Sequence, residues 1–299
     1  MDLSVRRRKS FAELITPWLE DYREDRSRNT ADYAKDDKIY RITVSPLYNG
    51  QKEKGSQLTI TDNTHDQQYI HFIKSYNDRL NADVAAATEH IRQMHDNLIL
   101  SMATMVESRD NSTGGHIRRT SEGVKILLSE MTQQEFPELT DDFRKNLIKA
   151  APMHDLGKIA VPDEILQKPG RFTPEEFEKM KAHAAEGAKV IHEILLHTDD
   201  DSFKKVAENV AHYHHERWDG SGYPEKLAGE QIPIEARIMA IADVYDALVS
   251  KRVYKEAFDF ARADKIIMEG MGSQFDPRLQ SVYEKARPKL EAYYASLAE

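Results

Sequence analysis

Apolar residues recur at intervals of three or four between residues 65 and 107. The stripe consists of Tyr69, Phe72, Tyr76, Leu80, Val84, Ala87, Ile91, Met94, Leu98, Met102 and Met105. This spacing places the stripe on one face of an α-helix, which would be roughly 60 Å long at 1.5 Å per residue. It predicts either a coiled-coil signalling helix that pairs with its copy in a homodimer, or a long core helix of the domain that follows. The histidines of this segment have no matching ligand partners and are expected at the surface or an interface: His65, His71, His90 and His95.

From about residue 100 to the C-terminus, the pattern predicts one helix after another, joined by short loops. Thr173-Pro174-Glu175-Glu176 is a capping box with proline at the first helical position, so a helix is expected to begin there. Asp276-Pro277 is a similar start signal for the final helix. Because strands and helices do not alternate in this region, residues 100–299 are predicted to form an all-α domain.

The first 64 residues predict a small α/β segment. Residues 1–36 are polar and highly charged, which favours a helical lead-in. Residues 38–46 and 56–61 are rich in β-formers, and Asn49-Gly50 between them predicts the turn of a β-hairpin. Since two strands cannot bury a face alone, the hairpin should pack on flanking helices or be the end of a larger sensor domain. Its pattern resembles the last hairpin of a PAS sensor, so residues 1–64 are interpreted as a partial sensor.

The composition is that of an ordinary soluble globular protein, with 40% hydrophobic and 31% charged residues. A run of about 18 apolar residues is absent, so no transmembrane helix is expected. The N-terminus also lacks the apolar core of a secretory signal peptide. The formal charge of −9 argues against binding to a nucleic acid polymer, but bound metals can still attract a small phosphate-bearing substrate.

Two further features concern localisation. The chain contains no cysteine, which excludes disulfides and thiolate metal sites and is consistent with a cytoplasmic protein. The basic cluster Arg6-Arg7-Arg8-Lys9 predicts a solvated terminus or, alternatively, a juxtamembrane segment. In the second case the chain would be the cytoplasmic part of a membrane receptor.

Imidazole and carboxylate side chains occur in separate packets along the predicted helices. In chain order they are His116, His154, Asp155, His183, His214, His215 and Asp243. These residue types are the ligands of hydrolytic transition-metal sites, and several helices can direct them into one bundle interior. Asp155 can bridge two metals beside His154, at a helix end that Gly157 is expected to close. The remaining histidines of the domain are expected to be packed or solvated: His192, His197 and His212.

The densest packet is the run His214-His215-Glu216-Arg217-Trp218-Asp219-Gly220-Ser221-Gly222-Tyr223-Pro224. Its two histidines are candidate ligands. Glu216 and Asp219 are expected to orient imidazoles or to close the turn, with a simple surface role as the alternative for Glu216. Tyr223 can donate a hydrogen bond to substrate from a loop shaped by Gly220 and Gly222.

His154-Asp155 with the distant Asp243 resembles the HD superfamily of metal-dependent phosphohydrolases. The run HHERWDGSGYP, with Lys158 three residues after Asp155, is similar to the HD-GYP subgroup in particular. The resemblance covers residues 100–288. Further matching segments are Arg109-Asp110, Thr113-Gly114-Gly115-His116, Lys168-Pro169-Gly170-Arg171, Pro233, Ala236-Arg237-Ile238 and Ala242-Asp243-Val244-Tyr245-Asp246-Ala247-Leu248.

This resemblance implies a phosphodiesterase that opens cyclic di-GMP to the linear dinucleotide pGpG and often on to GMP. It also implies two divalent metals, iron or manganese, held by the seven residues named above. Asp155 would be the bridging ligand, and Lys158, Tyr223 and Arg252 match positions that hold substrate phosphates. Two metals can share a hydroxide, lower its pKa and stabilise the transition state of in-line attack. Lys158 and Arg252 would supply cationic hydrogen-bond donors to phosphate oxygens.

One position departs from the subgroup pattern. Some members carry a glutamate four residues before the first histidine, and it supports a third metal. Here that position is Ser112, and Glu107 and Asp110 are out of register, so a binuclear centre is expected. Two alternative functions stay open. One is hydrolysis of another cyclic dinucleotide, such as cyclic GMP-AMP. The other is a non-catalytic, metal-bearing sensor or adaptor that signals through the coiled coil.

Overall fold

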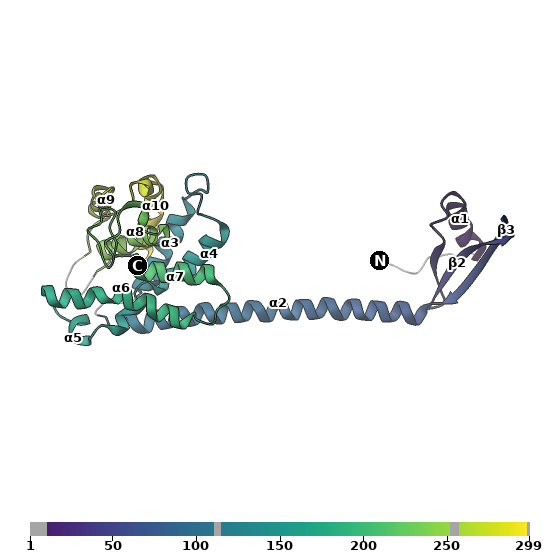
Figure 1. The fold of residues 1–299 in the computed structure, drawn as a ribbon, viewed down its shortest axis with the longest axis horizontal. Coiled ribbons are helices and arrows are strands. Elements are labelled where there is room, and N and C mark those ends of the chain that lie inside the picture. Colours follow the sequence, from purple (N-terminus) through teal and green to yellow (C-terminus); the bar gives the residue numbers. More distant parts are fainter. Residues whose placement is uncertain (1–10, 111–114, 252–256, 298–299) are drawn as a thin grey trace. The chain divides into compact units, whose positions relative to one another are not determined.

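The computed structural model describes residues 11–110, 115–251 and 257–297. The chain divides into two compact units, residues 1–90 and 91–299, and the division falls within the long helix α2 (Thr64–Glu107). Figure 1 shows the order of the elements along the chain. Within the described residues, no helix combines the length and apolar character needed to cross a membrane.

The first unit contains a helix and a three-stranded antiparallel sheet. Helix α1 (Phe11–Glu24) precedes strands β1 (Thr30–Lys35), β2 (Lys38–Asn49) and β3 (Lys52–Asp62), which lie in the order β1-β2-β3. Its buried apolar side chains include Tyr22 on α1 and Ile42 and Val44 on β2. The first part of α2 completes this unit.

The prediction for this unit is correct in class and wrong in one element. The helical lead-in holds for α1, but residues 30–35 form strand β1 instead, so the predicted hairpin is a three-stranded sheet. Asp36 and Asp37 join β1 to β2 with φ of 48° and 62°. Two consecutive positive φ values characterise the type I′ hairpin turn, which aspartate tolerates better than most residues. The second turn lies at Gly50 (φ 65°), where the sequence predicts it.

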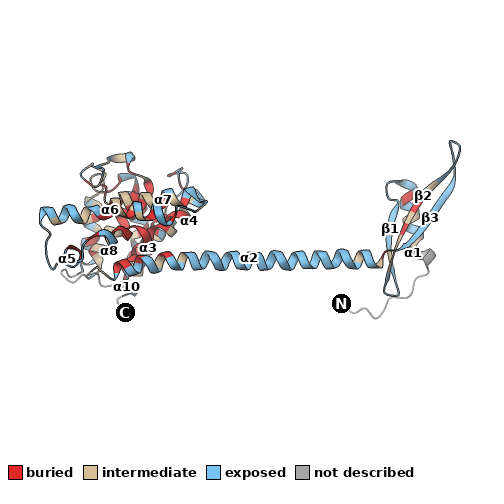
Figure 2. Ribbon diagram, turned by 60° about the horizontal axis from the view of Figure 1, so that its bottom comes forward, coloured by how far each residue is buried: buried red, intermediate tan, exposed pale blue. Residues whose placement is uncertain are grey.

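Helix α2 confirms the helix predicted for residues 65–107. The apolar stripe lies on its exposed side, with Tyr69 61% and Ile91 64% accessible, and Figure 2 shows α2 exposed along most of its length. A different face, carrying Ile99, Ala103 and Val106, is buried in the core of the second unit. The interpretation of the stripe itself as a core face is therefore wrong, because the core uses other residues of the helix.

The second unit is all-α, as predicted. Its α-helices are α3 (His116–Ser129), α4 (Asp141–Ala150), α5 (Asp163–Leu166), α6 (Pro174–Ile194), α7 (Asp201–Tyr213), α8 (Ile234–Val249), α9 (Phe260–Glu269) and α10 (Gln280–Ser296). Short 3-10 helices lie between them: η1 (Ala151–Met153), η2 (Leu156–Ala160), η3 (Gly229–Gln231) and η4 (Pro277–Leu279). The capping box at Thr173 begins α6, whereas Asp276 caps η4, the turn that leads directly into α10.

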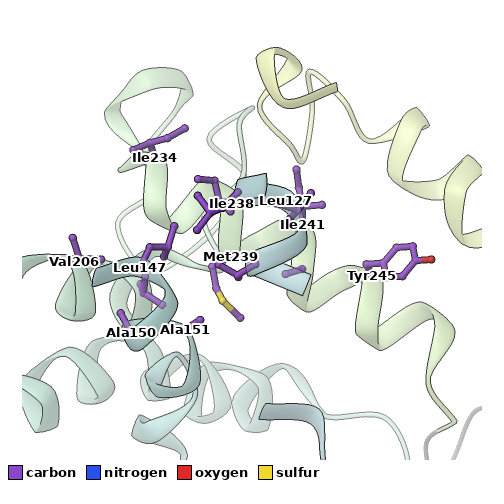
Figure 3. Packing of buried hydrophobic residues seen from close by; sticks show 14 of the residues in the cluster. Leu127, Leu147, Ala150, Ala151, Val206, Ile234, Ile238, Met239, Ile241 and Tyr245 are labelled. Atoms are coloured by element: carbon purple, nitrogen blue, oxygen red, sulfur yellow. The ribbon is translucent and has the colours of Figure 1, made fainter. Parts of the chain in front are cut away.

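Helix α8 runs through the core of this unit. It is apolar on most of its circumference, which is typical of a fully surrounded helix. Figure 3 shows Ile238, Met239 and Ile241 of α8 among Leu127 of α3 and Leu147 of α4. Helices α3, α7 and α9 pack against it. The tight packing fixes the position of the polar side chains that α8 contributes to the centre described next.

Candidate metal centre

All seven predicted metal ligands come together in the second unit. Their ligand atoms form two groups, each within 4.8 Å: Asp155, His183, His214 and His215 in one, and His116, His154 and Asp243 in the other. They come from the start of α3, the η1–η2 junction, α6, the end of α7 and α8. His192, His197 and His212 belong to neither group. These His/Asp clusters could hold metal ions.

Asp155 faces both groups, one carboxylate oxygen toward each. Its Oδ1 lies 3.5 Å from Nε2 of His183 and 3.8 Å from Nε2 of His214. Its Oδ2 lies 3.4 Å from Nε2 of His154 and 3.7 Å from Nε2 of His116. Ligand atoms that share a metal at about 2.1 Å are roughly 3–3.5 Å apart. The spacing therefore suits a carboxylate shared by two ions.

Backbone carbonyls fix the orientation of three of the imidazoles. Nδ1 of His154 donates to the carbonyl of Ala151 (2.9 Å), Nδ1 of His183 to that of Met180 (2.6 Å), and Nδ1 of His214 to that of Val210 (3.0 Å). This contact keeps the proton on Nδ1 and leaves Nε2 as a bare lone pair. Among the described residues, Nε2 of His183 and of His214 is buried without a hydrogen-bond partner. Such an orphaned lone pair is costly unless a metal binds it, so the residues fit a metal centre.

The protonation states also suit metal binding. Burial lowers the pKa of His183. It also lowers the pKa of His214 to about 3 and the pKa of His215 well below its usual value. These imidazoles are therefore neutral at pH 7, as metal ligands must be. Burial alone would raise the pKa of Asp155, but the Lys158 ammonium and the His116 side chain hold it well below its usual range. Burial opposes protonation of His116, yet Asp155 and Asp246 raise its pKa to about 9, so a metal bound there must displace a proton.

Asp246 holds His116 in place, a role for which the sequence offered no prediction. Its Oδ2 lies 2.7 Å from Nδ1 of His116, and its Oδ1 accepts from Nε of Arg119 (2.6 Å) and the hydroxyl of Tyr294 (2.9 Å). The carboxylate is only 1% exposed. A carboxylate bound to the far nitrogen of a ligand histidine fixes its tautomer and orientation. The sequence signal that could have indicated this role is the position of Asp246 three residues after Asp243, on the same face of a helix.

Residues at and just after the end of α2 support the segments that carry the centre. Oε1 of Glu107 accepts from the backbone N–H of His116 at 2.7 Å. Arg109 donates to the carbonyl of Ile159 (3.1 Å) and to Asp163 (2.7 Å). Glu107 thus supports the first turn of α3, where His116 lies. Ser112, the position that decides the expected metal count, lies outside the described residues, and so does the predicted phosphate contact Arg252.

Lys158, a predicted substrate contact, lies between two carboxylates. Its Nζ is 2.7 Å from Asp110 and 2.8 Å from Asp155. Burial disfavours the charged ammonium, but the two carboxylates raise its pKa above the usual value. The residue therefore carries a permanent charge at the edge of the ligand cluster, next to the carboxylate that faces both groups.

The loop after His215 is closed by its own carboxylates. Glu216 is buried and accepts from the backbone N–H of Glu225 (2.7 Å) and Leu227 (3.1 Å). Asp219 accepts from the backbone N–H of Ser221 (2.9 Å). Both contacts correspond to the turn-closing role, and the burial of Glu216 excludes a simple surface role.

A cavity of about 430 Å³ opens beside the ligand cluster. It is lined by His214 and His215, by Tyr223 of the loop and by Phe177 and Lys181 of α6, among others. The ring of Tyr223 lies 4.8 Å from that of His215, centroid to centroid. The predicted substrate-facing tyrosine therefore borders both the ligand cluster and the cavity.

Comparison with known proteins gives one family. The model of the HD domain family matches residues 101–279. A cyclic di-GMP phosphodiesterase of Vibrio cholerae is 44% identical over 214 residues, which are 70% of this chain and 43% of the relative. A cyclic di-GMP phosphodiesterase of Thermotoga maritima is 34% identical over 226 residues, which are 75% of this chain and 58% of the relative. A 3′3′-cGAMP-specific phosphodiesterase of V. cholerae is 36% identical over 211 residues, which are 70% of this chain and 38% of the relative.

The chain spans about half the length of the curated relatives it matches. The family match covers more than half of the chain and includes all seven residues of the two ligand groups. It also includes the His154-Asp155 pair and the Gly222-Tyr223-Pro224 loop after which the subgroup is named. The chain therefore belongs to the HD domain family and, within it, to the HD-GYP group.

Proposed function

We propose that this chain is a metal-dependent phosphodiesterase that hydrolyses cyclic di-GMP to pGpG. The observation that carries the proposal is the position of Asp155, whose two oxygens face two separate groups of imidazoles. A shared carboxylate between two ligand groups is the arrangement of binuclear hydrolases. The names of relatives at 44% and 34% identity support cyclic di-GMP as the substrate.

The residues present would hold two divalent ions. The imidazole-rich ligand set favours iron over magnesium, and the family resemblance implies iron or manganese. When bound, such ions lower the pKa of water and neutralise charge on phosphoryl oxygens. The chain itself positions the groups: Asp246 and three backbone carbonyls hold the imidazoles in register. Lys158, bound to Asp155, would place a fixed positive charge at the edge of the reacting phosphate.

A second candidate substrate is cyclic GMP-AMP. A V. cholerae phosphodiesterase named for this dinucleotide is 36% identical over 70% of the chain. The two substrates differ in one base and share the reacting phosphodiester, so the metal cluster alone does not distinguish them. The choice depends on residues that contact the bases.

The test is hydrolysis by the purified chain loaded with Fe(II) or Mn(II). Cyclic di-GMP, cyclic GMP-AMP and bis(p-nitrophenyl) phosphate are supplied separately, and the products are resolved by chromatography. We expect conversion of cyclic di-GMP to pGpG, with cyclic GMP-AMP converted at least about tenfold more slowly, which corresponds to roughly 1.4 kcal/mol of discrimination. Binding of either dinucleotide without turnover under both metals would instead identify a sensor.

We further propose that the exposed stripe of α2 pairs with the same stripe of a second copy. Its ten steps from Tyr69 to Met105 cover 36 residues, a mean of 3.6 per step. A repeat of 3.5 gives a left-handed supercoil and one of about 3.67 a right-handed one, so this stripe favours nearly straight paired helices. A continuous exposed apolar surface of this length would favour aggregation unless a partner covers it. A second copy supplies a surface of matching length and pattern.

Charge placed on the stripe should separate the copies. The double substitution Leu80→Glu and Val84→Glu is expected to reduce the mass measured by light scattering from that of a dimer to that of a monomer. The reason is that like charges would face each other across the interface. The control is Ala82→Glu, an exposed position two residues from Leu80 and therefore about 200° around the helix. A dimeric mass for the double variant, or a monomeric wild-type chain, would refute the pairing.

A further inference from the structure

Lys181 is a cation in the cavity for which the proposed mechanism has no use. It lies on α6, and its Nζ is 4.7 Å from the ring centroid of Phe177 and 5.6 Å from that of Tyr223. All three residues line the cavity, together with the ligand residues His214 and His215. The ammonium therefore lies near two aromatic rings that line the cavity, and the faces of such rings attract a cation.

The chemistry of the substrate requires such a group. A cyclic dinucleotide carries two phosphodiesters, and only one of them can be attacked at the metal cluster at a time. The other phosphate keeps its negative charge in a cavity that lies beside a ligand cluster with two carboxylates, Asp155 and Asp243. Binding it without a cation would leave like charges close together, which is costly.

Two other described cations near the cavity, Lys158 and Arg217, are less suited to this role, and Lys226 is tested separately below. Lys158 is held between Asp110 and Asp155. The guanidinium of Arg217 donates to Ser221 at 2.9 Å and lies 3.7 Å from Asp219. Lys181 is paired with Glu178 at 2.7 Å, but the side chain of that glutamate is 70% exposed. An exposed ion pair contributes little, so a phosphate can replace it at low cost.

Resting on the proposed function, we infer that Lys181, flanked by Phe177 and Tyr223, binds the second, non-reacting phosphate of the cyclic dinucleotide. Lys181 thereby determines specificity for cyclic dinucleotides over simple phosphodiesters. A charge-assisted hydrogen bond to an ionised group contributes about 1.5–3 kcal/mol, which corresponds to roughly a 10- to 100-fold change in affinity.

The chain offers a matched control on the same helix. Lys189 forms the same kind of pair, with Glu186 at 2.7 Å and three residues away, but it is 70% exposed and does not line the cavity. Lys181→Gln and Lys189→Gln therefore remove the same charge from the same helix and break equivalent ion pairs. KM and kcat are measured for the metal-loaded full chain with cyclic di-GMP and with bis(p-nitrophenyl) phosphate, which has a single phosphate.

We expect Lys181→Gln to raise KM for cyclic di-GMP at least tenfold and to leave kcat/KM for bis(p-nitrophenyl) phosphate within twofold of wild type. Lys189→Gln should change KM and kcat for neither substrate. Equal losses on both substrates would show that Lys181 supports the fold or the metal cluster, which overturns the inference. An unchanged KM for cyclic di-GMP would also overturn it, and a KM raised by Lys226→Gln alone would assign the second phosphate to Lys226, the other cavity-lining lysine.

Failure of the proposed function gives a different result. A wild-type chain that binds cyclic di-GMP without hydrolysing it would refute the enzyme but not this inference. In that case the dissociation constant from calorimetry replaces KM in the same comparison. A wild-type chain that neither binds nor hydrolyses a cyclic dinucleotide would refute both.

Discussion

Replacement of Asp155 by asparagine is expected to remove bound metal from both ligand groups and to abolish phosphodiester hydrolysis. The amide keeps the size of the side chain but offers one oxygen instead of two, so it cannot face His154 and His183 with equivalent ligand atoms. Substitution of a residue that merely supports a ligand costs about 10- to 100-fold in metal affinity or activity. Loss of the shared ligand should exceed the upper end of that range.

Metal content by mass spectrometry and product formation by chromatography check this expectation together. Asp199→Asn is the matched control, because Asp199 is an exposed aspartate outside both ligand groups. The control should retain the metal and the activity of the wild-type chain. An Asp155→Asn protein that retains two metals per chain would show that the two groups do not share this carboxylate.

Much of the centre could be predicted from the sequence because its ligands belong to residue types with few other uses at buried helical positions. His154-Asp155 and His214-His215 are adjacent pairs, and the packets lie at the ends or along the faces of helices that their own capping signals define. Thr173 is an example: its capping box fixes the first turn of α6 and hence the helix that carries His183. Local signals of this kind do not depend on the rest of the fold.

The supporting contacts could not be predicted in the same way, because each depends on a partner distant in the sequence. Asp246 contacts His116 across 130 residues, and Lys158 contacts Asp110 across 48. Lysine and aspartate are also common on solvated helix faces, so a single sequence does not show which residues pair with each other. Strand β1 was missed because residues 1–36 as a whole were interpreted as a charged helical lead-in, although Asp36 and Asp37 form the turn that follows the strand.

Gly157 shows how a correct position can receive the wrong explanation. The sequence interpretation placed it at the end of a helix, as a residue that stops it. In the structure α4 ends at Ala150, and Gly157 lies inside η2, where that segment packs along α6. An added Cβ would lie 1.9 Å from the carbonyl oxygen of His183 and 2.4 Å from the backbone nitrogen of Gly187. The glycine therefore allows two backbones to approach, which brings Asp155 next to His183.

Gly157→Ala is accordingly expected to destabilise the second unit by about 3 kcal/mol or more, at or above the upper end of the usual cost of overpacking. The clash involves backbone atoms of α6, so no side-chain rotation can relieve it, and η2 must move away from the helix. The free energy of unfolding in urea measures the loss, and metal content measures the accompanying separation of Asp155 from His183. Gly123→Ala is the control, because its Cβ would meet Ala242 at an ordinary 3.4 Å. Within helix α3 that change should be neutral or stabilise by up to about 1 kcal/mol. Equal stability of the two variants would mean that the backbones of η2 and α6 are not in contact at Gly157.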